Sequence, residues 1–289
     1  MESYHYSFPV FITNNRKIYC KELKNIHYKN IIKFIENNDD IGLCNFFEKI
    51  VEELSNGENL NYIDKFLILL SLRMVCVNKM LVLESSSQIK SSISLEDIIK
   101  KIIENFTPNL RTLQCMKDIE IIIGYPNTIK SKDNIFDKIH SININGSNVT
   151  FANISNKEKD EILSLLPASV AQEIYKELIK DESFKEIKLF SFYLQEGIEQ
   201  EYFFSYDSKR NFELLKSLYS DSLKNLYYYE YICSYKLHIP LNDYLYNMTP
   251  VETILQIKTL TNELESQNKA AKASNQKSST PPPGLGSPR

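Results

Sequence analysis

The histidine and cysteine side chains are the first candidates for metal binding or nucleophilic catalysis, and their spacing favours neither. The histidines lie far apart, outside the H-x-x-x-H and H-E-x-x-H patterns of zinc sites, at His5, His27, His140 and His238. The cysteines are odd in number, widely spaced and without a C-x-x-C pair, at Cys20, Cys44, Cys76, Cys115 and Cys233. This pattern predicts reduced thiols that mostly fill the core, and no metal site.

The glycine and serine patterns that bind phosphate or activate a hydroxyl are also missing. The seven glycines are too dispersed for a phosphate-binding loop of the Walker or dinucleotide type, and no G-x-S-x-G elbow occurs. We therefore expect a non-enzymatic protein with no catalytic residue and no cofactor. An enzyme whose site assembles from scattered residues is the most distant alternative.

Charge and hydropathy argue against further classes of protein. The 289 residues carry a net charge of −3 and an isoelectric point near 5.9, whereas a dedicated nucleic-acid binder usually has a basic face. The most apolar stretch, Phe66 to Leu83, is interrupted by Arg73 and Lys79, so we expect no membrane span. The first residues show no basic segment followed by an apolar one, so we expect no secretory signal and a cytosolic protein.

A cluster of tyrosines between residues 227 and 235 is a candidate binding surface. Tyrosine combines a large apolar ring with a polar tip and is enriched at protein interfaces. Basic companions for nucleic-acid stacking are sparse, so core packing or a protein interface is the better interpretation. The interface candidates from this cluster are Tyr228, Tyr231 and Tyr235.

Arg73 is a second candidate, because it lies in the most apolar predicted helix, where a charge needs a partner. We predict a structural ion pair between Arg73 and either Asp64 or Glu84. A contact between Arg73 and a partner protein is the alternative.

The first part of the chain predicts a hairpin followed by helices. Residues 4–22 form the hairpin, because Asn14-Asn15 suits a tight turn between two apolar runs. Apolar periodicity predicts helices over residues 23–35, 43–54 and 62–78, the last apolar nearly all round and therefore central. Asp39 or Asp40 is expected to cap the second helix. A short strand at 80–83 and an amphipathic helix at 95–106 follow.

The middle of the chain predicts a small β element, and the rest predicts helices. A strand at 119–125 precedes a hairpin at 142–151 closed by Asn145-Gly146. Helices are expected near 158–166, 170–178 and 212–236. The run Thr249-Pro250-Val251-Glu252 is a capping box that opens a last helix. That helix is expected to bury the apolar residues Val251, Ile254, Leu255, Ile257, Leu260 and Leu264.

Together these elements predict an α+β fold that is mainly helical. An N-terminal hairpin with helices occupies residues 1–106, a central β insert residues 107–155, and a helical region residues 156–265. Residues 266–289, rich in Pro, Ser and Lys, are expected to form a disordered cationic tail.

Several short motifs occur in an order shared with a known protein family. An acidic residue opens a helix that ends in a Leu-Arg pair, a later strand ends in Gly-Tyr-Pro, and a Met-x-Pro-x-Glu run opens the last helix. The residues at these places are Asp64, Leu72, Arg73, Tyr125, Pro126, Met248, Pro250 and Glu252. In these motifs the chain resembles the baseplate hub and hub assembly proteins of T-even-type contractile-tailed bacteriophages, over about residues 5 to 265.

The resemblance implies a non-enzymatic role in building the hub of the phage tail baseplate, as a hub subunit or as an assembly chaperone. The implied partners are phage tail hub or tape-measure proteins, in the host cytoplasm and in the virion if the protein stays there. A generic cytosolic adaptor is the main alternative. We expect replacement of both Leu255 and Leu260 by Asp to abolish folding or partner binding.

Overall fold

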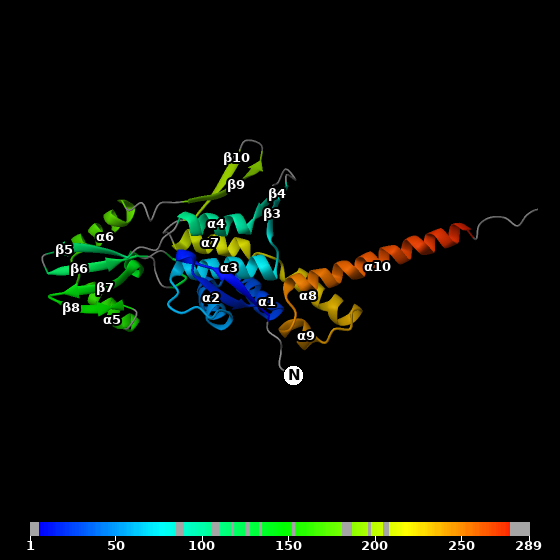
Figure 1. Ribbon diagram of the computed structural model, residues 1–289, viewed down its shortest axis with the longest axis horizontal. Helices are drawn as coiled ribbons and strands as arrows, with labels where there is room; N and C mark the ends of the chain where they lie inside the picture. The colour runs from blue at the N-terminus through cyan, green and yellow to red at the C-terminus, as the bar shows by residue number, and fades with distance from the viewer. Residues whose placement is uncertain are drawn as a thin grey trace, which may run out of the picture.

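The computed structural model describes residues 6–84, 90–105, 110–116, 118–124, 128–132, 135–151, 154–180, 187–195, 198–204 and 208–277. Its elements form several small antiparallel sheets among helices, so the predicted α+β, mainly helical class is confirmed. A helical body lies in the middle, with a sheet-containing part on one side and a long helix on the other (Figure 1).

The chain begins with the predicted hairpin. Strand β1 (Ser7–Phe11) pairs antiparallel with β2 (Lys17–Lys21). Asn14 and Asn15 have φ values of 58° and 53°, a left-handed conformation that Asn adopts more readily than most residues. The hairpin packs on the helical body through buried residues such as Val10 and Ile18.

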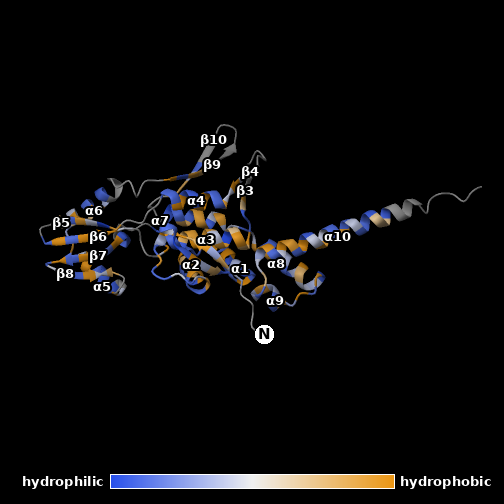
Figure 2. Cartoon of the chain, viewed as in Figure 1, coloured by the Kyte–Doolittle hydropathy of each residue, from blue (hydrophilic) through white to orange (hydrophobic). Residues whose placement is uncertain are grey.

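Three helices follow, and the third is the centre of the core. They are α1 (Asn25–Glu36), α2 (Asp40–Leu54) and α3 (Tyr62–Cys76), and Asp39 caps α2 by accepting a hydrogen bond from the Gly42 N–H at 2.9 Å. Helix α3 is apolar on almost every side, as the orange colour in Figure 2 shows, and its residues are nearly all buried. Such a helix needs cover on all faces.

Helices from the C-terminal part supply that cover. Helix α7 (Ser208–Leu218) packs against α3, and α8 (Leu223–Tyr231) packs against α1. Tyr219 is fully buried and donates a hydrogen bond from its hydroxyl to the Leu69 carbonyl at 2.6 Å. The helical body is therefore built from both ends of the chain.

The predicted helix over residues 212–236 is broken in the structure. Helix α7 ends at Leu218, and α8 starts at Leu223 after a cap by the Ser222 hydroxyl. A single π-helical turn, η5 (Ile232–Lys236), continues α8, and α9 (Leu241–Tyr246) follows. The break lets Tyr219 enter the core while α8 turns toward α1.

The central β element is a four-stranded antiparallel sheet in the order β5-β6-β7-β8. The strands are β5 (Arg111–Met116), β6 (Ile119–Ile123), β7 (Ile139–Ile144) and β8 (Ser147–Thr150), with a 3-10 turn, η2 (Ile135–Lys138), before β7. The predicted Asn145-Gly146 turn joins β7 and β8, with φ values of 52° and 81°. Both residues therefore adopt the left-handed conformation that a two-residue hairpin turn requires.

Two helices accompany this sheet. They are α5 (Asn156–Ser164), which begins with the predicted Ser155–Glu158 capping box, and α6 (Ala168–Lys180). Helix α6 packs against β5 and η2, and Arg111 pairs with Glu177 at 3.2 Å. The predicted boundary at residue 155 stays a prediction, and these contacts place α6 beside the sheet (Figure 1).

Two further hairpins stand beside helix α4 (Leu95–Asn105). The predicted strand at 80–83 is β3 (Met80–Glu84), and it pairs with an unpredicted strand, β4 (Lys90–Ser94). Strands β9 (Ile187–Gln195) and β10 (Ile198–Phe204) form the second hairpin, and they lie between the helices expected near 170–178 and 212–236, where no strand was predicted. Aromatic and branched residues such as Ile187, Phe190 and Tyr202 favour a strand there.

The last helix, α10 (Pro250–Lys277), is longer than predicted and projects from the body (Figure 1). The expectation of disorder from residue 266 is wrong up to Lys277, and residues 278–289 lie outside the described residues. Ala, Lys, Gln and Glu are good helix formers, and they extend a helix already nucleated at Pro250. The predicted burial of Leu255 and Leu264 is also wrong, because their exposed fractions are 57% and 50%.

Candidate protein interaction site

In the described part of the chain, four of the five cysteines are buried, and His27 takes part in capping helix α1. No group of three His, Cys, Asp or Glu residues is placed there to hold a metal ion. Burial raises the pKa of Cys20 and Cys76 to about 12, so both thiols stay protonated and are poor nucleophiles. The Nδ1 atom of His27 accepts a hydrogen bond from the Lys24 N–H at 3.1 Å and closes the first turn of α1.

Asp64 is a structural joint between the N-terminal hairpin and α3. Its carboxylate accepts hydrogen bonds from the Thr13 N–H at 3.0 Å, the Thr13 hydroxyl at 2.5 Å and the Asn61 N–H at 3.2 Å. Arg16 adds an ion pair at 3.4 Å. The side chain is buried and satisfied by these donors, so it offers no surface to a partner.

Arg73 is a second joint, and the predicted ion pair with Asp64 is wrong. The Asp64 carboxylate is taken by the hairpin, whereas the Arg73 Nε donates to the Leu218 carbonyl at 2.8 Å and its Nη1 to the Asn78 carbonyl at 3.1 Å. Leu218 ends α7, where carbonyls lack helical partners and a cation is favourable. The Glu84 side chain lies outside the described residues.

Pro250 and Glu252 fix the start of α10 to the body. The predicted capping box is confirmed: Glu252 accepts from the Thr249 N–H at 2.7 Å, and the Thr249 hydroxyl accepts from the Glu252 N–H at 3.3 Å. The Asn25 side-chain amide donates to the Thr253 hydroxyl and to the Tyr244 carbonyl, both at 2.8 Å. These bonds hold α9 and α10 against α1.

The predicted tyrosines lie together on one exposed face of α8 and η5. Their exposed fractions range from 49 to 69%, and we call this set the tyrosine face: Tyr227, Tyr228, Tyr231 and Tyr235. The rings of Tyr231 and Tyr235 stack with centroids 5.2 Å apart and planes at 20°. The tyrosine face is thus a contiguous aromatic surface, and core packing is not its role.

One charge that α1 brings beside this face, Lys29, is paired, whereas Lys224 and Lys236 are exposed. The Lys29 ammonium lies 4.4 Å from the centre of the Tyr227 ring, and it also forms an ion pair with Glu230 at 2.5 Å. A cation so neutralised contributes little to binding a phosphate backbone. The surroundings suit a protein partner that buries aromatic rings better than a nucleic acid.

Helix α10 contacts both α8 and η5, the two elements that carry the tyrosine face. It has aliphatic residues that are exposed, Leu255 and Leu264, or half-buried, Leu260. The predicted interface residues therefore divide into two groups. Tyr228, Tyr231, Tyr235 and Leu255 are exposed and Leu260 is half-buried, whereas Asp64, Arg73, Pro250 and Glu252 hold elements together.

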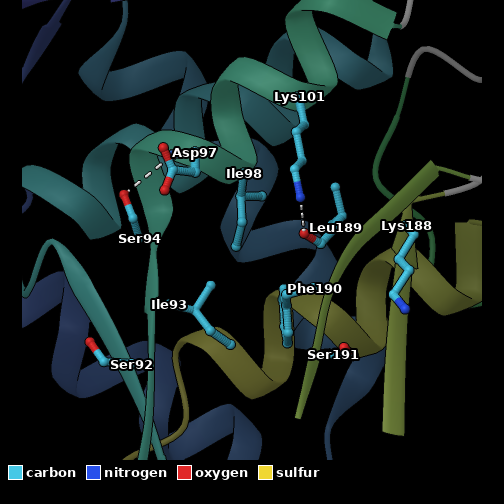
Figure 3. A pocket seen from close by; sticks show the side chains of 10 residues that line it. All are labelled: Ser92, Ile93, Ser94, Asp97, Ile98, Lys101, Lys188, Leu189, Phe190 and Ser191. Carbon is cyan, nitrogen blue, oxygen red and sulfur yellow. Dashed lines mark hydrogen bonds between the residues drawn. The ribbon is translucent and has the colours of Figure 1, made fainter. Parts of the chain in front are cut away.

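The sequence did not point to the pocket between β4, α4 and β9 (Figure 3). Its volume is about 440 Å³, and its walls come from two hairpins that are more than 90 residues apart in the chain. The sequence signal in β4 is weak, because this strand has a single apolar residue, Ile93, between Ser92 and Ser94.

Comparison of the chain with protein-family models, with curated proteins and with solved structures finds no match. Over the described residues, no helix combines the length and the apolar character that crossing a bilayer requires. The interpretation of the site therefore rests on its geometry and chemistry.

Proposed function

We propose that this chain is a non-enzymatic assembly protein that docks a partner protein on the tyrosine face and the adjoining part of α10. The observation that carries the proposal is the exposure of four neighbouring tyrosines with exposed fractions of 49 to 69%. Solvent-exposed aromatic rings on a rigid helix bury a large apolar area when a partner binds, and they lose little side-chain entropy.

The anchoring of this face supports the proposal. Helix α8 is held by the Lys29–Glu230 pair and by packing on α1, and α10 is held by the capping box at Thr249. The surface is therefore preorganised, which lowers the cost of binding. Nothing in this arrangement requires a bound cofactor.

The partner we propose belongs to the tail hub of a contractile-tailed phage, as a hub or tape-measure protein. This part of the proposal rests on the motif resemblance at Asp64, Arg73, Pro250 and Glu252. A chaperone that shields an apolar hub surface needs an exposed apolar face of its own. A hub subunit needs the same face permanently.

The test is an affinity capture with a matched surface control. The tagged protein, a variant carrying Tyr228→Ser, Tyr231→Ser and Tyr235→Ser, and a Tyr175→Ser control are expressed in the natural setting. Tyr175 is 54% exposed on α6, away from the tyrosine face. Captured proteins are identified by mass spectrometry, and circular dichroism verifies that all three chains fold.

We expect the parent and the Tyr175 control to recover tail hub or tape-measure proteins, and the triple variant to lose them. Presence of the protein in mature virions then identifies a subunit, and its absence from them identifies a chaperone. Equal recovery by all three chains contradicts the tyrosine face as the docking surface. Recovery of a specific partner that is not a phage protein favours a generic adaptor.

A further inference from the structure

Beyond helix α10 the chain carries a proline-rich segment. Residues 278–289 have the sequence Ser-Ser-Thr-Pro-Pro-Pro-Gly-Leu-Gly-Ser-Pro-Arg, and we call them the proline segment. Consecutive prolines favour the extended polyproline II helix, which has no internal hydrogen bonds. A segment of this composition presents apolar rings and unpaired carbonyl oxygens, and it has little backbone freedom to lose on binding.

The tyrosine face offers the groups that such a segment binds. Proline-rich segments dock on surfaces lined with aromatic side chains. The four rings of the tyrosine face have exposed fractions of 49 to 69%, and those of Tyr231 and Tyr235 stack with centroids 5.2 Å apart. Within the described residues, none of these four hydroxyls donates a hydrogen bond, so each is available to a backbone carbonyl of a partner.

The charges around the tyrosine face disfavour a basic occupant and are compatible with a neutral one. Glu230 of α8 pairs with Lys29 at 2.5 Å, so it is not free to bind a cation of a partner. Lys224 and Lys236 are exposed, and they form no ion pair with a described residue. A basic segment would be repelled by these two lysines, whereas residues 278–288 carry no charged side chain.

Helix α10 decides which copy of the chain supplies the proline segment. Its 28 residues rise about 42 Å, and α8 and η5 contact it near its start (Figure 1). Lys277 therefore lies about 30 Å beyond those contacts. The prolines at 281–283 follow Lys277 by at most six residues, which span no more than about 22 Å when fully extended. The proline run thus falls short of the tyrosine face of its own chain, and a second copy must supply it.

We propose that the tyrosine face binds the proline segment of a second copy of this chain, in the polyproline II conformation. The proline rings cover the tyrosine rings, and the tyrosine hydroxyls donate to carbonyls of the segment. Reciprocal exchange between two copies closes a symmetric dimer, whereas one-way binding builds a head-to-tail chain. This inference rests on the docking role proposed for the tyrosine face, and it adds that a partner protein competes there with the chain's own segment.

The first test is complementation between two variants of the full-length protein. One is the tyrosine-face triple variant, and the other, the proline variant, carries Pro281→Ala, Pro282→Ala and Pro283→Ala. Sedimentation velocity is measured from about 1 to about 200 μM. We expect the parent to associate as its concentration rises and each variant to stay monomeric. An equal mixture of the two variants should form a 1:1 complex, because each contributes the part that the other lacks.

Matched controls separate the proline run and the tyrosine face from their surroundings. Ser278→Ala, Ser279→Ala and Thr280→Ala together change three neighbouring residues of the same segment, and Tyr175→Ser changes an exposed tyrosine of α6. Both controls should associate as the parent does, and circular dichroism verifies that every variant folds. Association of the parent should be alike in about 50 mM and about 500 mM NaCl, since the proposed contact contains no ion pair.

The second test uses the proline segment itself as the probe. A fluorescein-labelled peptide with the sequence of residues 278–289 is titrated with the parent protein by fluorescence anisotropy. We expect saturable binding with a Kd of about 100 μM or below. A peptide with alanine in place of the prolines at 281–283 should bind at least about tenfold more weakly, and so should the natural peptide to the tyrosine-face triple variant.

Several results would overturn the inference. They are no saturable binding of the peptide, equal binding of the alanine peptide, equal loss of association in the Ser–Thr control and in the proline variant, or loss of association at high salt. Peptide binding by a parent that stays monomeric at every concentration would also contradict it, because the segment would then occupy the face of its own chain.

Failure of this inference is distinguishable from failure of the proposed function. The proline variant keeps the tyrosine face, so it should capture the partner of the proposed function at least as well as the parent does. Self-association without capture of a hub partner would leave the inference standing and remove that partner. Capture of the partner by a parent that neither associates nor binds the peptide would do the reverse.

Discussion

At the scale of residues, the buried side chains of Asp64 and Arg73 join elements of the fold. Asp64 accepts from the Thr13 N–H at 3.0 Å and from the Asn61 N–H at 3.2 Å, while Arg73 donates to two backbone carbonyls. Each charge is placed where backbone groups would otherwise be buried without a partner. Their stabilising effect therefore comes from the groups they satisfy.

Replacement of Asp64 by Ala tests this role. The change leaves the Thr13 and Asn61 N–H groups without their acceptor, so we expect the free energy of unfolding to fall by about 2–4 kcal/mol. Urea denaturation followed by circular dichroism measures it. Asp160→Ala, at an exposed position of α5, is the control and should stay within about 0.5 kcal/mol of the parent. If Asp64→Ala lowers the free energy of unfolding by less than about 0.5 kcal/mol, water replaces the carboxylate as the acceptor for these N–H groups.

His27 makes stability depend on pH. Burial lowers the pKa of His27 below its ordinary 6.5, against a smaller raising effect of Glu53. The unfolded chain therefore binds a proton at His27 at higher pH than the folded chain does. The contribution of His27 to the free energy of unfolding is fully present above the pKa of the unfolded chain, about 6.5. It falls as the pH drops from there toward the lower pKa of His27 in the folded chain.

We expect the parent to lose more stability than His27→Gln when the pH falls from 7.5 to 5.5. Gln retains an acceptor for the Lys24 N–H but does not titrate. Thermal unfolding at each pH gives the comparison, with His238→Gln as an exposed control that should follow the parent. If the unfolding temperatures of the parent and of His27→Gln depend on pH in the same way, His27 is not the source of the pH dependence.

At the scale of elements, the sequence predicted the turns and helix starts that depend on neighbouring residues alone. Asn14-Asn15 and Asn145-Gly146 mark turns because few residues adopt positive φ, and Thr249-Glu252 marks a helix start because it satisfies its own backbone. The β9–β10 hairpin was missed because its strands are stabilised by packing on α4 and α7, far away in the sequence. Which tyrosines face water depended on a π-helical turn that no spacing rule reveals.

The buried face of α10 was predicted wrongly, and the expected effect of replacing Leu255 by Asp therefore changes from folding to binding. An apolar stripe identifies the side of a helix that favours burial, but the helical body packs against only the first turns of α10. We expect Leu255→Asp to change the unfolding free energy by less than about 0.5 kcal/mol, because its side chain is 57% exposed. Binding of a partner should weaken, so the predicted effect of the Leu255 and Leu260 pair falls on binding.

Thr253→Val is the contrasting change two residues away. Thr253 is buried and accepts a hydrogen bond from the Asn25 amide at 2.8 Å, so the change should cost about 1–2 kcal/mol of stability. Equilibrium unfolding in urea compares the two variants. A larger loss for Leu255→Asp than for Thr253→Val would mean that α10 is packed along its length.

At the scale of the whole molecule, the sheet-containing part is an insertion into a body made by both ends of the chain. The chain leaves the body after α4 and re-enters it in β9, and the bond from Lys101 to the Leu189 carbonyl shows that these points are adjacent. Between them, α6 packs on the sheet and Arg111 pairs with Glu177. The hydrogen bond from the Ile129 N–H to the Glu48 carboxylate at 2.5 Å also connects the insertion to the body.

Replacement of residues 106–186 by a short Gly-Ser linker should therefore leave a folded body. We expect a cooperative thermal transition with a Tm lowered by about 2–4 °C for each kcal/mol of lost contacts such as the Glu48 bond. Removal of only residues 107–155, the insert as the sequence predicts it, should destabilise the protein much more than the longer deletion does. That shorter deletion strips the sheet from α6 and exposes its buried Val170 and Ile174, which favours aggregation. Calorimetry and size-exclusion chromatography of the two deletions decide where the insertion ends: a folded product from the shorter deletion alone would place α5 and α6 with the body.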